Sequence, residues 1–212
     1  MVTNFLAMRA GKVQDGMVDA DQVTALRILL GSSTWLQRTR SFARALRGSA
    51  PRTSGGLLIV GTPEDEPWHL AAHLDQESRL AGIPGLAPTL VRWAPPPGAA
   101  PHLRVGMARL EQARRGETLF VVAPDAAPVP LLERVHDARR VGATILALDQ
   151  GDKDLDDMAH EYLNVEPGLA PFSFDAAQHL VSAAAGEPVP SRTGLRTRLA
   201  RLLDAVSGTQ PD

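Results

Sequence analysis

The sequence contains no cysteine, only two lysines among its 22 basic residues, and 4% aromatic residues. The absence of cysteine excludes disulfide bonds, thiolate catalysis and cysteine-ligated zinc. No apolar run approaches the roughly 18–20 residues that cross a membrane. The N-terminus also lacks the apolar core and cleavage-like end of a signal peptide. We therefore expect a cytoplasmic protein.

A large net charge is also missing from the 212 residues, since the formal net charge is −2 and the isoelectric point is about 6.3. This balance gives no overall attraction to nucleic acid or to an anionic membrane. Apolar residues make up 44% of the chain, which is enough to bury the core of one domain of ordinary size.

Short apolar runs alternate with segments of helical periodicity along most of the chain. Strands that alternate with helices pair in parallel, and continuously apolar strands indicate a sheet covered on both faces. We predict an α/β fold built on a doubly wound, five-stranded parallel sheet. The expected strands are 57–60, 89–93, 119–123, 144–148 and, more weakly, 162–165, and the expected helices are 66–81, 102–115, 129–141 and 173–185.

Two further segments of helical periodicity flank this region. Residues 20–47 predict a long N-terminal helix, or two helices, and LRTRLARLLDAV near the C-terminus predicts an amphipathic helix. The predicted organisation is a helical segment at 1–54 that packs on the domain, an α/β domain at 55–186, and a linker with a C-terminal helix at 187–212.

Three stretches carry a resemblance to a known family: GETLFVVAPDAAPVPLLERVHDARRVGATILAL, DLDDMAHEYLNVEP and HLDQESRLAGIP. They resemble strands, loops and helix ends of the sugar isomerase (SIS) family, over roughly residues 55–185, with a distant similarity to the phosphoheptose isomerases. The resemblance implies a flavodoxin-like sheet, dimers or tetramers, and a phosphosugar crevice at the carboxyl ends of the strands. Open α/β sheets generally bind ligands at that edge.

The loop after the first strand departs from the family's Gly-x-Gly-x-Ser turn. Gly61 and Thr62 are present, but Pro63 removes a hydrogen-bond donor and three carboxylates follow, including Glu64 and Asp65. A helix N-terminus attracts anions, and protein carboxylates satisfy it as well as a phosphate does. We predict that Thr62, or alternatively Asp65, caps the following helix and closes the phosphate site.

The loops after the third and fourth strands also carry carboxylates at the edge where the family binds phosphate. The family has Ser-x-Ser-Gly-x-Thr after its third strand, whereas this chain has APDAAP and no hydroxyl residue between Thr118 and Thr144. Asp125 is predicted to cap the next helix. Asp149 and Asp152 follow the fourth strand and are predicted to line the same crevice. The alternating Asp152, Asp154 and Asp156 do not make an EF-hand, because Asp157 stands where that loop needs glycine.

A metal site is the alternative interpretation of one helix. His73 and Glu77 lie four residues apart, which can chelate a divalent ion, and phosphoheptose isomerases carry a similar pair. The resemblance implies a third zinc ligand from a late helix, either His179 or Asp175. The competing interpretation is a solvated or dimer-facing polar stripe, with no cofactor.

Arginines cluster before the first strand and in the last helix. Such faces could bind nucleic acid, but they are more commonly solvated or paired with acids across a subunit contact. The clusters are Arg38, Arg40, Arg44, Arg47 and Arg52, and then Arg192, Arg196, Arg198 and Arg201.

These patterns favour a SIS-like binding, regulatory or assembly module that is not an active isomerase. We expect a homodimer or higher homo-oligomer, with a small carbohydrate-derived ligand in the crevice. The alternatives are a metal-assisted aldose–ketose isomerase of the phosphoheptose type and a SIS-type regulator that binds nucleic acid.

Overall fold

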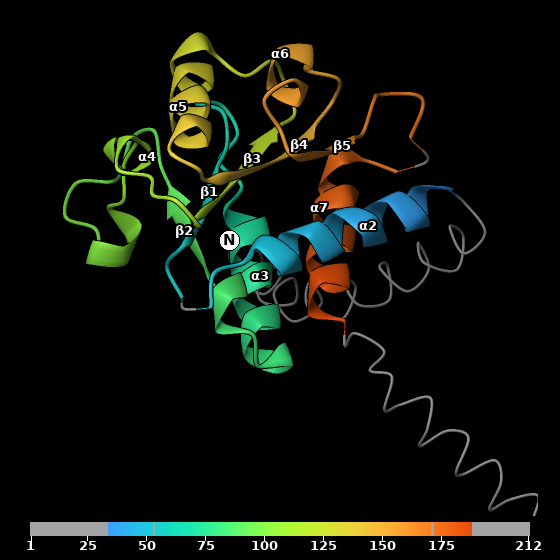
Figure 1. The fold of residues 1–212 in the computed structure, drawn as a ribbon, viewed down its shortest axis with the longest axis horizontal. Coiled ribbons are helices and arrows are strands. Elements are labelled where there is room, and N and C mark those ends of the chain that lie inside the picture. Colours follow the sequence, from blue (N-terminus) through green and yellow to red (C-terminus); the bar gives the residue numbers. More distant parts are fainter. Residues whose placement is uncertain (1–33, 53, 171, 188–212) are drawn as a thin grey trace, which may run out of the picture.

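The computed structural model describes residues 34–52, 54–170 and 172–187 and arranges five strands in one sheet. Every neighbouring pair is parallel, and the order across the sheet is β2-β1-β3-β4-β5 (Figure 1). The predicted doubly wound parallel sheet is therefore confirmed. The strands are β1 (Leu57–Val60), β2 (Pro88–Val91), β3 (Thr118–Ala123), β4 (Thr144–Asp149) and β5 (Glu161–Asn164).

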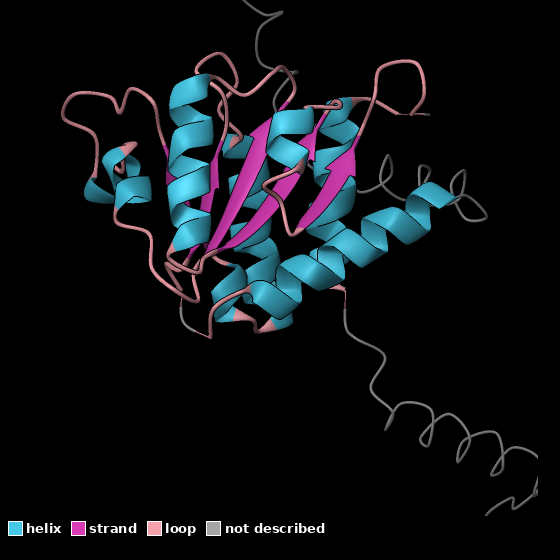
Figure 2. Ribbon diagram, turned by 45° about the horizontal axis from the view of Figure 1, so that its top comes forward, coloured by secondary structure: helices cyan, strands magenta, loops and turns pink. Residues whose placement is uncertain are grey.

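Helices cover both faces of the sheet (Figure 2). One face packs against α2 (Thr34–Ser49), α3 (Trp68–Ala81) and α7 (Phe174–Gly186). The other packs against α4 (Ala108–Glu111), α5 (Val129–Arg140) and α6 (Lys153–Asp156). Because both faces are covered, all residues of the two strands β1 and β3 are buried, which explains their unbroken apolar sequences.

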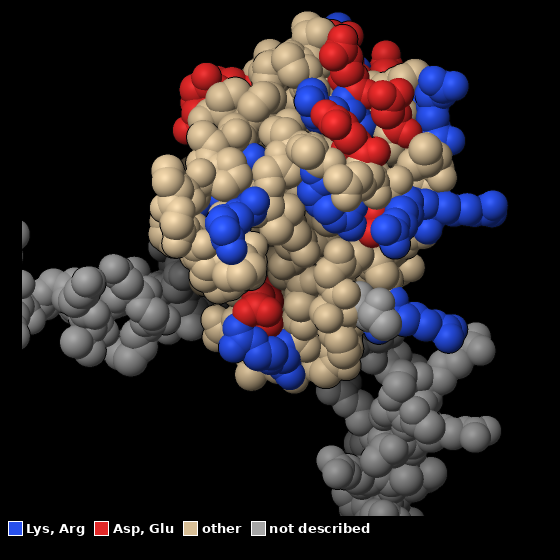
Figure 3. Space-filling model, turned by 90° about the vertical axis from the view of Figure 1, so that its left-hand side faces the viewer, with Lys and Arg blue, Asp and Glu red and all other residues tan. Residues whose placement is uncertain are grey.

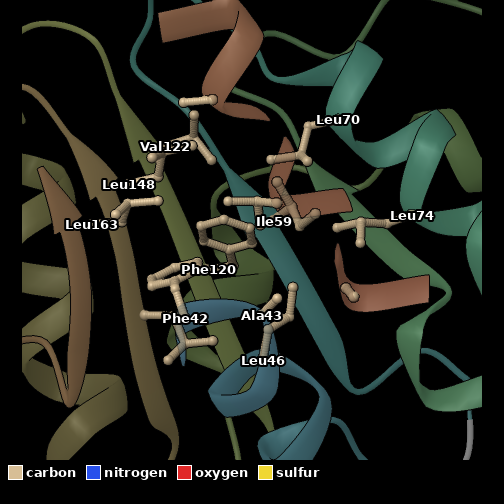
Figure 4. Close-up of a cluster of buried hydrophobic side chains, with 14 of the residues drawn as sticks. Phe42, Ala43, Leu46, Ile59, Leu70, Leu74, Phe120, Val122, Leu148 and Leu163 are labelled. Carbon is tan, nitrogen blue, oxygen red and sulfur yellow. The ribbon is translucent and has the colours of Figure 1, made fainter. Parts of the chain in front are cut away.

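The larger part of the core lies between the sheet and α2, α3 and α7. Phe120 and Val122 of β3 project into it, and the ring of Phe42 from α2 lies 5.4 Å from that of Phe120 (Figure 4). Leu119 and Val121 alternate to the opposite face and pack with α5. Helix α2 thus contributes to the same core as the sheet.

The two predicted terminal helices lie partly or wholly outside the described residues. Helix α2 begins at Thr34, and the earlier part of the predicted 20–47 segment lies outside the described residues. The predicted C-terminal helix and the arginines at 192–201 also lie outside them. Within the described ranges, no helix is long and apolar enough to cross a bilayer.

The predicted helix at 102–115 is wrong. The chain there forms a short 3-10 helix, η2 (Pro101–Leu103), and then only the four residues of α4. Between them, Arg92 donates its N–H to the Val105 carbonyl at 2.8 Å and forms a parallel bridge with Gly106. Pairing with the end of β2 draws this segment into an extended form and overrides its helical periodicity.

Candidate functional site

The order of the strands places the candidate site at the carboxyl ends of β1 and β3. The chain leaves β1 toward β2 on one side and leaves β3 toward β4 on the other, so the two following loops diverge. Such a switch point is where doubly wound sheets bind ligands. Gly61, Thr62, Glu64 and Asp65 follow β1, and Asp125 follows β3, so the structure brings these predicted residues to one edge.

The loop after β1 folds back on the end of its own strand. The Asp65 N–H donates to Thr62 Oγ1 at 3.2 Å, and Thr62 is buried. The position of an added Cβ on Gly61 lies 2.0 Å from the Asp65 carbonyl oxygen, so only glycine fits there. The indole N–H of Trp93 donates to the Gly61 carbonyl oxygen at 2.9 Å. Internal contacts therefore use the Asp65 N–H and the Gly61 carbonyl of this loop.

Neither predicted cap of α3 is correct. The helix begins at Trp68 with Pro67 as its N-cap residue, and no side chain accepts a hydrogen bond from its first turn. Thr62 and Asp65 form a separate turn upstream, and the Trp68 N–H donates to the Glu66 carbonyl at 2.8 Å. Pro67 lacks an N–H and suits the entry to a helix, which moves the start beyond both predicted positions.

Glu66 has a role that the sequence analysis missed. Its Oε2 accepts from Arg92 Nη2 at 2.5 Å and from Nε at 2.8 Å, and its Oε1 accepts from the Trp93 N–H at 3.3 Å. Arg92 and Trp93 follow β2, which pairs with β1, so the two strand ends are adjacent. The signal in the sequence was an arginine near the end of the expected second strand, 89–93. Glu66 therefore joins the loop after β1 to the end of β2.

The loop after β3 offers few donors to a ligand. Helix α5 begins after Pro128, and no side chain caps it, so the predicted capping by Asp125 is wrong. Pro124, Pro128 and Pro130 have no N–H, and the Leu131 N–H donates to the Pro128 carbonyl at 2.8 Å. Asp125 itself is exposed at the edge of the sheet.

Asp152 joins the loop after β3 to the loop after β4. Its Oδ2 accepts from the Ala127 N–H at 2.7 Å, and its Oδ1 accepts from the Leu155 N–H at 3.1 Å and caps α6. A protein carboxylate thus binds a backbone N–H beside the start of α5, in the region where the resemblance implies a phosphate. Asp152 lies at the predicted edge. Its hydrogen bond to the Ala127 N–H, in the loop after β3, was not predicted.

Replacing Asp152 with alanine should lower the free energy of unfolding by about 2 kcal/mol, because a helix cap and a hydrogen bond between loops are both lost. Differential scanning calorimetry would measure the change. Asp154→Ala on the exposed side of α6 is the matched control and should change stability by about 0.5 kcal/mol or less. Equal effects of the two variants would contradict the bridging role.

Asp149 does not line an open crevice, which corrects its predicted position. It is fully buried and lies on the same face of β4 as Ile145 and Ala147, beneath α6. Its Oδ1 accepts from the N–H groups of Gly151 at 2.7 Å and Asp152 at 3.1 Å. Burial and the neighbouring Asp156 carboxyl together raise the pKa of Asp149 to about 7, although these two hydrogen bonds act to lower it.

Carboxylates from three segments face one another at the crevice. Burial raises the pKa of Asp65, and the charges of Asp175 and Asp125 raise it further. Asp175 lies in the first turn of α7 and accepts from Gln178 Nε2 at 3.3 Å. This edge therefore brings three carboxylates together. A hollow of about 350 Å³ lies elsewhere, at the opposite end of α3.

The histidines predicted as alternative zinc ligands are partly brought together. The rings of His73 and His179 lie 4.7 Å apart, where α3 packs against α7. Glu77, in contrast, lies against Gly186, about two turns along α7 from His179. In the ranges the structure describes, no group of three or more His, Cys, Asp or Glu residues is arranged to hold a metal. The predicted set of three zinc ligands is not assembled.

Arg47 of the first cluster, and Arg109 outside the clusters, have partners within the chain. Arg47 Nε donates to the Ala185 carbonyl at 2.9 Å, at the C-terminal end of α7, and Nη2 donates to the carbonyls of Ala185 and Glu187. Arg109 pairs with Glu117 at 2.5 Å. On the face drawn in Figure 3, basic and acidic side chains lie next to each other. The nucleic-acid prediction gains no support from these contacts.

The fold and this edge define a doubly wound α/β domain with an acidic switch point. Compared with known proteins, the sequence matches no family model and no curated protein. Among solved structures, the chain is similar to a Silicibacter pomeroyi protein provisionally described as a phosphosugar isomerase. The identity is 16% and the TM-score 0.49, with 88% of this chain and 53% of that one covered.

Two other solved structures are similar over most of this chain. One is the sugar isomerase domain of the RpiR transcription factor from Sphaerobacter thermophilus, with 17% identity, a TM-score of 0.47, and 88% and 98% of the two chains covered. The other is the Vibrio vulnificus NanR protein complexed with ManNAc-6P, with 11% identity, a TM-score of 0.47, and 90% and 73% covered. The chain spans little more than half the length of the first two similar structures.

Proposed function

We propose that this protein is a SIS-like binding, regulatory or assembly module that does not catalyse sugar-phosphate isomerisation. The observation that carries the proposal is that three backbone N–H groups at the switch point are bonded to acceptors within the chain. The N–H groups of Asp65, Trp68 and Ala127 are bonded to Thr62 Oγ1, the Glu66 carbonyl and the Asp152 carboxylate. A phosphate needs such donors to be open, as they are at an anion-binding helix N-terminus.

The charges at the edge support the same function. The charges of Asp175 and Asp125 both act on Asp65, and the loops after β1 and β3 lack the hydroxyl pattern of the family. A carbohydrate-derived ligand at this edge would therefore be uncharged or carry an amine, because three carboxylates oppose a dianion. This ligand class is part of the proposal.

A second candidate function is a metal-assisted isomerase of the phosphoheptose type, and the contact between His73 and His179 favours it. The residues present fit zinc only in part, because Glu77 lies against Gly186. The candidate is tested together with the first.

Thermal unfolding of the full chain against a panel of sugar phosphates separates the two functions. We expect a flat panel with and without zinc, and a midpoint that rises only with neutral or amino sugars such as glucosamine. A ligand at about 100 times its dissociation constant adds roughly 2.7 kcal/mol, which corresponds to a shift of about 5–10 °C. Such a shift with a sugar phosphate would overturn the proposal.

Two controls complete the experiment. If a shift requires zinc, the double variant His73→Ala, His179→Ala should abolish it, which would assign the isomerase-type site. Sedimentation equilibrium of the same samples tests the homo-oligomer. A monomer at micromolar concentration would remove the assembly part of the proposal and leave the ligand part standing.

A further inference from the structure

Three buried oxygen atoms without a hydrogen-bond partner gather at the end of β4 and β5. In the described part of the chain, only four buried side-chain nitrogen or oxygen atoms lack a partner, and Asp149 Oδ2, Asp156 Oδ1 and Asn164 Oδ1 are three of them. Buried polar atoms are normally bonded, so a group of three calls for a bound species.

These three residues come from adjoining elements. Asp149 is the last residue of β4 and pairs in register with Asn164, the last residue of β5, so their side chains lie on the same face. Asp156 lies on α6, which covers that face, and its Oδ2 accepts from Asn164 Nδ2 at 3.0 Å. Asp149 has no exposed surface, so its free oxygen is directed into the protein.

The group carries excess negative charge. Two carboxylates lie side by side, and no Lys or Arg forms a salt bridge with either of them in the part of the chain that the structure describes. Buried charges are stable only when they are paired or coordinate a metal. Either a proton or a cation must therefore compensate this group.

The number of free oxygens favours a cation. One proton can join Asp149 Oδ2 to Asp156 Oδ1, but it leaves Asn164 Oδ1 without a partner and the pair with one negative charge. A hard divalent cation takes carboxylate and amide oxygens as ligands and balances both carboxylates. We propose that Asp149, Asp156 and Asn164 bind a divalent cation, Mg²⁺ or Ca²⁺, between β4, β5 and α6.

This site is separate from the acidic crevice and does not depend on the proposed function. It contains two carboxylates and an amide oxygen, with water completing the coordination, so it differs from sites with three acidic or histidine ligands. Asp152 caps α6 and also accepts a hydrogen bond from the Ala127 N–H in the loop after β3. A cation beneath α6 would therefore stabilise the loop that replaces the phosphate cradle.

Cation titrations of the full chain test the proposal, after treatment with EDTA and removal of the chelator, at pH 7.5 and constant ionic strength. We expect Ca²⁺ or Mg²⁺ to raise the unfolding midpoint saturably, by about 5–10 °C at 100 times the dissociation constant. Calorimetric titration should give one site per chain. Asp156→Asn should abolish both signals, whereas Asp154→Asn, on the exposed side of α6, should keep them.

The opposite results overturn the proposal. Wild-type protein that gives neither calorimetric binding nor a midpoint shift has no such site, whatever the variants do. A shift that survives in Asp156→Asn places the ion elsewhere. Stability that rises from pH 8 to pH 6 without any response to cations would assign a shared proton to Asp149 and Asp156 instead.

Discussion

Gly61→Ala should lower the free energy of unfolding by about 3 kcal/mol, since overpacking against a rigid neighbour reaches the upper end of such costs. The added Cβ would lie 2.0 Å from the Asp65 carbonyl oxygen and 2.5 Å from Pro67 Cδ. Backbone atoms cannot move aside as a flexible side chain can, so the loop after β1 must shift. The midpoint of thermal unfolding should fall by about 6–12 °C.

Gly48→Ala is the matched control for this variant. Gly48 lies in α2, and no heavy atom is within 4 Å of the position of its added Cβ. Alanine is favoured over glycine in a helix by about 0.5–1 kcal/mol, so this variant should be as stable as the wild type or slightly more stable. Melting of Gly61→Ala within about 2 °C of the wild type would contradict the folded-back loop.

Phe120→Ala should have the largest effect, lowering the free energy of unfolding by about 3–5 kcal/mol. Phe120 is fully buried at the centre of β3 and packs against Phe42, so its loss leaves a cavity between the sheet and α2. Small domains are stable by only about 5–15 kcal/mol, so the variant should be close to unfolding at 37 °C. Urea unfolding followed by circular dichroism measures the change.

An exposed aromatic residue provides the control for Phe120. Tyr162 of β5 is 47% exposed, and Tyr162→Ala should cost less than about 1 kcal/mol. If the two variants lost the same stability, the stabilisation would come from general aromatic content rather than from the packing of α2 on β3. A small loss for Phe120→Ala alone would indicate that the core collapses around the cavity.

Strands β1 and β4 could be predicted because each contains a short apolar run next to a glycine. β1 lies between Gly56 and Gly61, and β4 follows Gly142 and Ala143, so composition alone marks their positions. The N-terminal caps of α3 and α5 could not be predicted as well. Thr62 and Asp125 have the chemistry of helix caps, but prolines nearer to each helix determine where it begins.

The candidate site was predictable in position but not in detail. Thr62, Asp65 and Asp125 lie at the expected edge because parallel strands all end on the same side of the sheet. Asp149 was expected to be open to a ligand, yet the short helix α6 covers it. A four-residue helix leaves too weak a periodicity to reveal which face it covers.

The amino-acid sequence by itself determined the parallel sheet and the absence of hydroxyl side chains from the loop after β3, because both follow from local composition. Only the tertiary structure decided the partners of the carboxylates. Glu66 binds Arg92, Asp152 binds the Ala127 N–H, and Asp149 is buried beside Asp156 and Asn164. Each of these contacts joins segments that meet only after the crossover helices have brought the strand ends to one edge. Their pairing therefore depends on the packing of the whole sheet.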